Sequence, residues 1–252
     1  MNLVKINELM IGEGKPKIAV PIVGKTIADI IQEAETLQSL PCDLVEWRLD
    51  LFDEVENYQL VADVSHRLHA LLPGKPLLLT FRTLQEGGGR AFEAAAYYEL
   101  YRQIIENGKA DMLDLELFMA DGQGAQIIKE AKAKGICIIM SNHDFEQTPS
   151  QTDICHRLLL MAEKQADICK IAVMPQSPAD VLTLLAATNE VRQKTDRPIV
   201  TMSMGQLGLV SRIFGEIFGS AITFGAAEQS SAPGQLPVGR LVELLETASW
   251  QG

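Results

Sequence analysis

Eight short apolar runs, separated by longer segments of helical periodicity, constrain the fold of this sequence more than any other feature. The runs lie at 17–23, 44–50, 76–82, 111–117, 135–142, 168–174, 198–204 and 220–226. Most are nearly continuous rather than alternating, which is typical of parallel strands covered on both faces. Between them lie amphipathic segments such as 26–39, 91–106, 151–165 and 178–194. The pattern indicates an α/β protein.

The boundaries of these segments carry ordinary helix signals. Thr26 and Ser150 are expected to act as N-caps, and Gly108 and Gly135 to end helices. Eight strand–helix cycles in 252 residues, without a Pro- or Ser-rich linker, predict a single (β/α)8 barrel over residues 1–252. We expect segment 2–15 to form a small extra β-ribbon that closes one end of the barrel.

An open, doubly wound sheet is the alternative architecture. Such sheets usually carry a glycine-rich phosphate loop after the first strand. Gly24-Lys25-Thr26 resembles the end of such a loop, but the upstream position that requires glycine is Ala19. The barrel is therefore the preferred prediction.

Charge and cysteine content narrow the class of protein. A net charge of -11 argues against a nucleic-acid binder and against attraction to anionic membranes. Cys42, Cys137, Cys155 and Cys169 show no C-x-x-C spacing, so we expect neither disulfides nor a zinc site. No run approaches the roughly 18–20 apolar residues that span a bilayer, and the start lacks signal-peptide features. We expect a cytoplasmic protein.

Polar side chains recur where the apolar runs end, which is where a barrel of this kind places its active site. They are Glu46, Arg48, Arg82, Glu86, Asp114, Glu116, His143, Lys170 and Arg212, followed after the last run by Ser231, Gly234 and Gln235. If the barrel is correct, these groups converge at one end of it.

Lys170 interrupts a run that otherwise has every mark of a buried strand. Burying an ammonium ion is costly unless it is paired or its pKa falls. A lysine kept neutral in this way is a nucleophile toward carbonyl carbon. The alternative is a lysine that reaches solvent from a strand end, or pairs with Glu46 or Glu116. Its position alone leaves both interpretations open.

His143 and three arginines supply the remaining chemistry. A histidine at a strand end suits proton transfer near neutral pH, although an ordinary hydrogen-bonded histidine is the alternative. Arg48, Arg82 and Arg212 can clamp an anion, because the guanidinium matches a carboxylate, or can neutralise neighbouring acids. Three arginines near a strand lysine favour a small anionic substrate.

The other groups have supporting roles. Glu46 and Glu86 can orient His143 or pair with an arginine, and the loop containing Ser231 and Gln235 has the composition of a lid. No His/Asp/Glu spacing resembles a metal site.

Six motifs together resemble type I 3-dehydroquinate dehydratase. They are Glu46-Trp47-Arg48; Thr80-Phe81-Arg82 with Glu86-Gly87-Gly88; Asp114-Leu115-Glu116; Ser141-Asn142-His143-Asp144-Phe145; Lys170-Ile171-Ala172; and Ser231-Ala232-Pro233-Gly234-Gln235. They occur in the family's order, and the similarity runs from about residue 10 to the C-terminus.

The resemblance implies a (β/α)8 barrel, commonly a homodimer, that catalyses the third step of the shikimate pathway without metal or organic cofactor. 3-Dehydroquinate would lose water through an imine on Lys170 and leave as 3-dehydroshikimate. His143 would transfer the protons, and Glu86 would orient His143.

The same resemblance assigns the substrate-binding residues. Arg212 would hold the substrate carboxylate, and Ser231 and Gln235 would close over the ring. Glu46, Trp47, Arg48 and Arg82 would bind ring hydroxyls and shape the local charge. One departure is Pro21, which stands where some relatives carry a serine, so any side-chain hydrogen bond from that position is lost.

Two other functions compete with this one. A class I aldolase would share the fold and the lysine imine but break a C–C bond. A non-catalytic anion-binding barrel would give no reason for a lysine within a strand. His143, Arg212 and the 231–235 loop favour the dehydratase.

Overall fold

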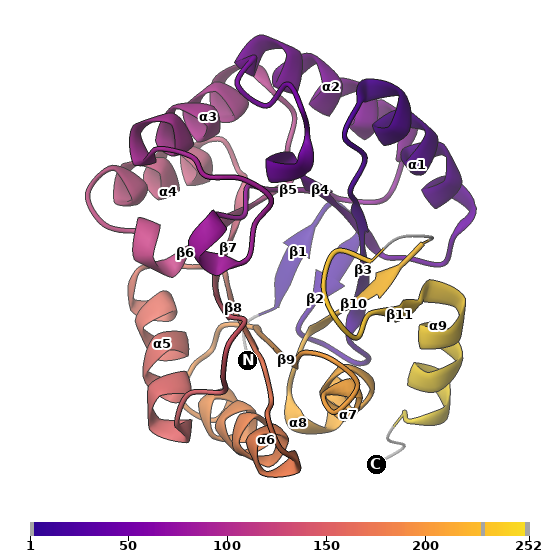
Figure 1. Cartoon of the computed structure of the whole chain (residues 1–252), viewed down its shortest axis with the longest axis vertical. Coiled ribbons are helices and arrows are strands. Elements are labelled where there is room, and N and C mark those ends of the chain that lie inside the picture. The colour runs from indigo at the N-terminus through magenta and orange to yellow at the C-terminus, as the bar shows by residue number, and fades with distance from the viewer. Residues whose placement is uncertain (1–2, 228–229, 250–252) are drawn as a thin grey trace.

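The computed structural model describes residues 3–227 and 230–249, which form a barrel of parallel strands inside a ring of helices (Figure 1). The barrel strands are β3 (Lys17–Ile22), β4 (Leu44–Arg48), β5 (Leu77–Thr80), β6 (Met112–Glu116), β7 (Cys137–Asp144), β8 (Ile168–Val173), β9 (Ile199–Ser203) and β10 (Ile222–Ala226). Neighbours pair in chain order, and β10 pairs with β3. A bridge between Ile199 and Ser220 closes the ring. The predicted (β/α)8 barrel is confirmed.

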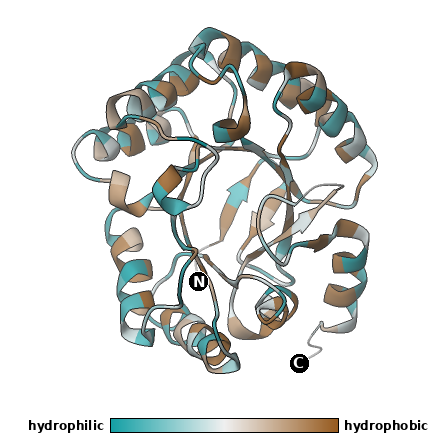
Figure 2. Cartoon of the chain, in the orientation of Figure 1, coloured by the Kyte–Doolittle hydropathy of each residue, from teal (hydrophilic) through white to brown (hydrophobic). Residues whose placement is uncertain are grey.

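Helices follow the strands and cover the outside of the barrel. They are α1 (Ile27–Ser39), α2 (Tyr58–Leu71), α3 (Ala94–Asn107), α4 (Gln123–Ala133), α5 (Gln151–Glu163), α6 (Pro178–Arg192), α7 (Leu209–Ile213), α8 (Gly215–Phe218) and α9 (Val238–Thr247). Three short 3-10 turns, η1 (Leu49–Leu51), η2 (Leu84–Glu86) and η3 (Leu117–Met119), follow β4, β5 and β6, and β11 (Leu236–Pro237) pairs with β10. Hydrophobic residues recur on the barrel side of the helices (Figure 2).

The predicted N-caps and glycine terminators are confirmed. The side chains of Thr26 and Ser150 accept the backbone N–H groups of Asp29 and Asp153, so each caps its helix. Gly108 ends α3, and Gly135, at φ 76°, follows α4.

Two strands end two residues earlier than predicted. The run 76–82 stops at Thr80: the N–H of Phe81 donates to the Tyr101 hydroxyl at 3.1 Å and that of Arg82 to Asp50 at 3.2 Å. The run 44–50 likewise stops at Arg48 and turns into η1.

Strand alternation divides the apolar residues into two layers. One layer packs between strands and helices, and the other fills the barrel interior near the amino ends of the strands. The ribbon of β1 (Val4–Ile6) and β2 (Leu9–Ile11) adds Ile6 and Ile11 to this interior layer, so it closes that end as predicted. The carboxyl ends of the strands are left for polar groups.

Candidate active site

The two-residue period of β4 sends Glu46 and Arg48 toward the cavity at the carboxyl end and Trp47 the opposite way. Trp47 is fully buried in the outer layer, with its ring centroid 5.7 Å from that of Phe52. The expectation that Trp47 contacts substrate is therefore not supported by its position: neighbours on one strand face opposite sides of the sheet.

Lys170 lies inside the barrel and is only 4% exposed. Its Nζ is 3.1 Å from Oδ2 of Asp114, 3.9 Å from Oε1 of Glu46 and 4.6 Å from the centroid of the Phe224 ring. The ammonium is thus paired mainly with Asp114, a partner that sequence reasoning did not name, and it also meets an aromatic face.

Arg82 is held by the carboxylates beneath the site. Its guanidinium donates to Glu116 and to Asp114, each at 2.9 Å, and to the Ser141 hydroxyl at 3.0 Å. Burial opposes ionisation of Asp114, but Arg82 and Lys170 outweigh it and lower the pKa of that carboxyl. Arg82 therefore neutralises its neighbours, the second of the roles considered for it, while still lining the cavity.

His143 and Glu86 form a hydrogen-bonded pair at the edge of the cavity. Oε2 of Glu86 lies 2.9 Å from Nδ1 of His143 and accepts the backbone N–H of His143, also at 2.9 Å. Burial, aided by the positive charges of Arg82 and Lys170, lowers the pKa of His143 well below its usual range. The imidazole is therefore neutral at pH 7 and able to take a proton.

The pKa of Glu86 is shifted in the opposite direction. Burial, with the negative charge of Glu116, raises the pKa of Glu86, whereas Arg82 and the hydrogen bond from Asn142 lower it. The donors around this carboxyl therefore oppose the effect of burial and favour its ionised form.

Glycines after η2 fix the position of Glu86. Gly87 has φ 82°, and a Cβ there would lie 2.4 Å from the Phe145 ring. A Cβ on Gly88 would lie 1.9 Å from the carbonyl oxygen of Arg82. These positions cannot carry a side chain without displacing the turn. These glycines are therefore a tightly packed support for Glu86.

The other two arginines have different environments. Arg48 donates to both carboxylate oxygens of Asp50, at 2.8 and 2.9 Å. Arg212, from α7, is 1% exposed and donates to the carbonyl of Pro233 at 3.0 Å. Burial lowers the pKa of Arg212 to about 10, so it stays charged at pH 7. Within residues 3–227 and 230–249 it forms no ion pair, and its Nε has no hydrogen-bond partner.

The loop expected to act as a lid covers the cavity. Gln235 accepts the N–H of Ser231 at 2.8 Å and donates to the Ser231 hydroxyl at 3.0 Å. Pro233 accepts the N–H of Gly205 at 3.2 Å; residues 228 and 229 lie outside the described chain. The space beneath is about 40 Å³, whereas sites for small molecules hold roughly 300–1,000 Å³. Some of the lining side chains or the loop must therefore shift before a ring enters.

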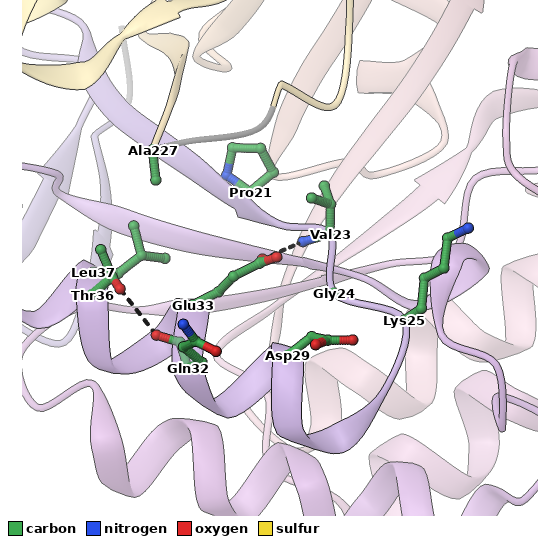
Figure 3. A pocket seen from close by; sticks show the side chains of 10 residues that line it. All are labelled: Pro21, Val23, Gly24, Lys25, Asp29, Gln32, Glu33, Thr36, Leu37 and Ala227. Carbon is green, nitrogen blue, oxygen red and sulfur yellow. Dashed lines mark hydrogen bonds between the residues drawn. The ribbon is translucent and has the colours of Figure 1, made fainter.

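A larger cavity of about 380 Å³ lies elsewhere, between α1 and the end of β3 (Figure 3). It contains Pro21, Lys25, Asp29 and Glu33, and Glu33 accepts the N–H of Val23 at 2.7 Å. The described residues that line it include no histidine, cysteine or arginine. The larger cavity is therefore not the one that contains the candidate catalytic side chains.

Two further observations concern cofactors and membranes. Among the described residues, no group of three or more His, Cys, Asp or Glu side chains is arranged to hold a metal ion. No helix within the described ranges is long and apolar enough to cross a membrane.

A buried strand lysine and a neutral histidine line one cavity at the carboxyl end of a (β/α)8 barrel. Arg212, an arginine without an anion, is not among the lining residues but contacts Met202, which is. This arrangement defines a barrel lyase of the lysine-imine class. Residues 18–250 match the family model of type I 3-dehydroquinase. The chain belongs to that family.

Individual relatives agree with this membership. The 3-dehydroquinate dehydratase of Enterococcus faecalis is 53% identical over 248 residues, covering 98% of each chain. The solved E. faecalis structure has a TM-score of 0.93 at 50% identity, covering 98% of this chain and 100% of that one.

A type I enzyme from Clostridium difficile, solved with covalently modified comenic acid, has a TM-score of 0.94 at 46% identity. The match covers 98% of this chain and 97% of that one. Family membership decides against the aldolase and the non-catalytic barrel.

Proposed function

We propose that this chain converts 3-dehydroquinate to 3-dehydroshikimate by eliminating water through an imine on Lys170. The observation that carries the proposal is the burial of Lys170 against Asp114 and Glu46, in a cavity that His143 also lines. Family membership supports the reaction, and the covalently modified ligand of the C. difficile relative accords with covalent chemistry.

The imine is the electron sink of the reaction. The Lys170 amine, once deprotonated, adds to the substrate ketone, and loss of water gives a protonated imine. That cation acidifies the neighbouring C–H far more than a ketone does, and it supplies the chemistry that a metal or organic cofactor would otherwise supply. We propose that no cofactor takes part.

His143 then carries the proton. With Nδ1–H donated to Glu86, the Nε2 lone pair removes the proton beside the imine carbon. The resulting imidazolium protonates the departing hydroxyl, which leaves as water. A second water hydrolyses the imine and frees both Lys170 and product, so one molecule of water is lost overall.

Binding follows from the remaining charges. We assign the substrate carboxylate to Arg212, because this buried cation forms no ion pair within the described chain. Glu46, Arg48 and Arg82 face the ring hydroxyls, and Ser231 and Gln235 cover them.

The wider context is also proposed. Residues 1–252 act as one catalytic domain, working as a homodimer in the cytoplasm without nucleic-acid or membrane partners. All four cysteines are free and buried, which fits a reducing compartment. Light scattering in solution tests the dimer, and a monomer mass would contradict it.

Borohydride trapping tests the function. Incubating the protein with 3-dehydroquinate and sodium borohydride, followed by peptide mass spectrometry, should place a reduced adduct on Lys170. Lys170→Ala should show neither adduct nor formation of the conjugated, ultraviolet-absorbing product. An adduct on another residue, or turnover by Lys170→Ala, would refute the mechanism.

A further inference from the structure

Asn142 connects the catalytic pair to the surrounding helices. It is 2% exposed, at the end of β7, and its Nδ2 donates to Oε1 of Glu86 at 2.9 Å. On its other side, Oδ1 accepts from Nη1 of Arg157 on α5 at 2.7 Å. A continuous chain therefore runs from Arg157 through Asn142 and Glu86 to Nδ1 of His143.

The chemistry of Arg157 fixes which way the amide of Asn142 faces. A guanidinium has donors only and stays protonated at any pH the protein meets. The carbonyl oxygen of Asn142 must therefore face Arg157, and its NH2 must face Glu86. Within the described ranges Arg157 forms no ion pair, and Asn142 is its one hydrogen-bond partner.

An NH2 group facing Glu86 favours the ionised form of that carboxyl, since a carboxylate accepts a hydrogen bond more strongly than a neutral carboxyl does. The His143 backbone N–H faces the same carboxylate, as does Arg82 at 3.6 Å. With Glu86 ionised, Nδ1 of His143 must carry the hydrogen, and Nε2 keeps the lone pair that a general base needs.

Reversing the amide would remove this support. An Asn142 oxygen facing Oε1 of Glu86 would either repel the carboxylate or require a proton on Oε1, which that oxygen would donate to Asn142. A neutral Glu86 would no longer stabilise the positive charge that His143 gains when Nε2 takes a proton.

We propose that Arg157 is a positioning residue that, by orienting Asn142, keeps Glu86 ionised against Nδ1–H of His143 and so leaves Nε2 as the base. This inference rests on the proposed role of His143 in the reaction. It adds a residue on the outer helix layer that touches neither substrate nor His143.

The expected pH dependence has a definite sign. The charged and titratable groups facing Glu86 are the same in every variant of Arg157: Arg82, His143, Glu116 and Asp114. The hydrogen bond from Asn142 lowers the pKa of Glu86, so losing the oriented donor raises it. The acidic limb of the kcat profile should then move to higher pH.

Arg157→Met is the variant that tests the proposal. We expect kcat at pH 7 to fall about tenfold, part of the ~10²–10⁴-fold that general acid–base catalysis supplies, with KM changed less than about twofold. Arg157→Lys, which keeps a donor, should recover most of kcat and the wild-type limb. It also serves if Arg157→Met folds poorly.

The control and a double-mutant cycle separate positioning from general damage. Arg102→Met removes a similar Arg-to-amide hydrogen bond, from Nη2 to Oε1 of Gln123 at 2.8 Å, and should leave the pH profile unchanged. In an Asn142→Ala background, Arg157→Met should cause no further loss of kcat.

Several results would overturn the proposal: an unmoved acidic limb, a rise in KM at constant kcat, or an equal loss in both backgrounds. The His143→Ala variant distinguishes a failure of the proposed reaction mechanism from a failure of the role proposed for Arg157. If His143→Ala is fully active, the proposed role of His143 fails; if it is inactive while Arg157→Met behaves as wild type, only the role of Arg157 fails.

Discussion

Buried charges at this site differ in whether the protein itself satisfies them. Lys170 and Arg82 share Asp114, whereas Arg212 has only neutral partners within the described chain. A buried cation without an anionic partner lowers the stability of the ligand-free protein. An anionic ligand that pairs with it removes that cost, so function can maintain the unpaired cation. Arg212 is therefore where substrate binding and protein stability oppose one another.

Arg212→Met should reveal that opposition. A hydrogen bond to a charged group contributes about 1.5–3 kcal/mol, so we expect KM for 3-dehydroquinate to rise roughly 10- to 100-fold. The free energy of unfolding should stay the same or increase, because the unpaired charge is gone. Steady-state kinetics and urea denaturation measure the two effects. An unchanged KM would remove Arg212 from the binding site.

For single residues, the sequence predicts which side chains lie at the site, but not which of them form ion pairs and hydrogen bonds with one another. Glu46, Arg82, His143 and Lys170 could all be named, because polar residues ending apolar strands converge in a barrel. The choice of Asp114 as the nearest partner of Lys170 depends on the stagger between β6 and β8, which no local pattern specifies. The misplacement of Trp47 came from treating a motif as a unit, although adjacent strand residues face opposite sides.

Among the elements, the turn after β5 determines most about the site. Glu86 reaches His143 because η2 and its glycines fold back so tightly that the N–H of Gly88 donates to the carbonyl of Thr83 at 2.8 Å. Strands, helices and caps were predictable from periodicity and capping residues. This turn was not, because a glycine triplet has the same sequence signature whether it is loose or packed.

Gly88→Ala tests how closely the turn is constrained. The added methyl would meet the carbonyl oxygen of Arg82, so η2 must shift and carry Glu86 away from His143. We expect at least about a tenfold loss of kcat, within the range for a misplaced acid–base group. Gly74→Ala is a control: Gly74 has φ 80°, but a Cβ there meets nothing within 4 Å. Equal activity of the two variants would contradict the role assigned to the turn.

In the molecule as a whole, residues that stabilise the fold and residues that carry out the chemistry lie at opposite ends of the barrel. The ribbon of β1 and β2 fills the amino end with Ile6 and Ile11, while Lys170, His143 and Glu86 line the cavity at the other end. This division follows from the barrel itself, in which the amino face contributes packing and the carboxyl face contributes function.

Ile11→Ala should therefore affect folding alone. Ile11 is fully buried, and truncating a buried isoleucine to alanine costs about 2–5 kcal/mol. The midpoint of urea denaturation should fall accordingly, while kcat and KM at 25 °C stay within about twofold of wild type. A large loss of kcat in the folded variant would show that the two ends are coupled.

The loop at 230–235 has a consequence for inhibitor design. Ser231 and Gln235 line the cavity, so in the proposed function a ligand that binds beneath them is expected to leave only after they move. Its residence time is then governed by loop opening as well as by its own contacts. A carbonyl compound bearing a carboxylate for Arg212 would form a reversible covalent bond and be enclosed at once. Slow dissociation is thus expected even for ligands that make few contacts of their own.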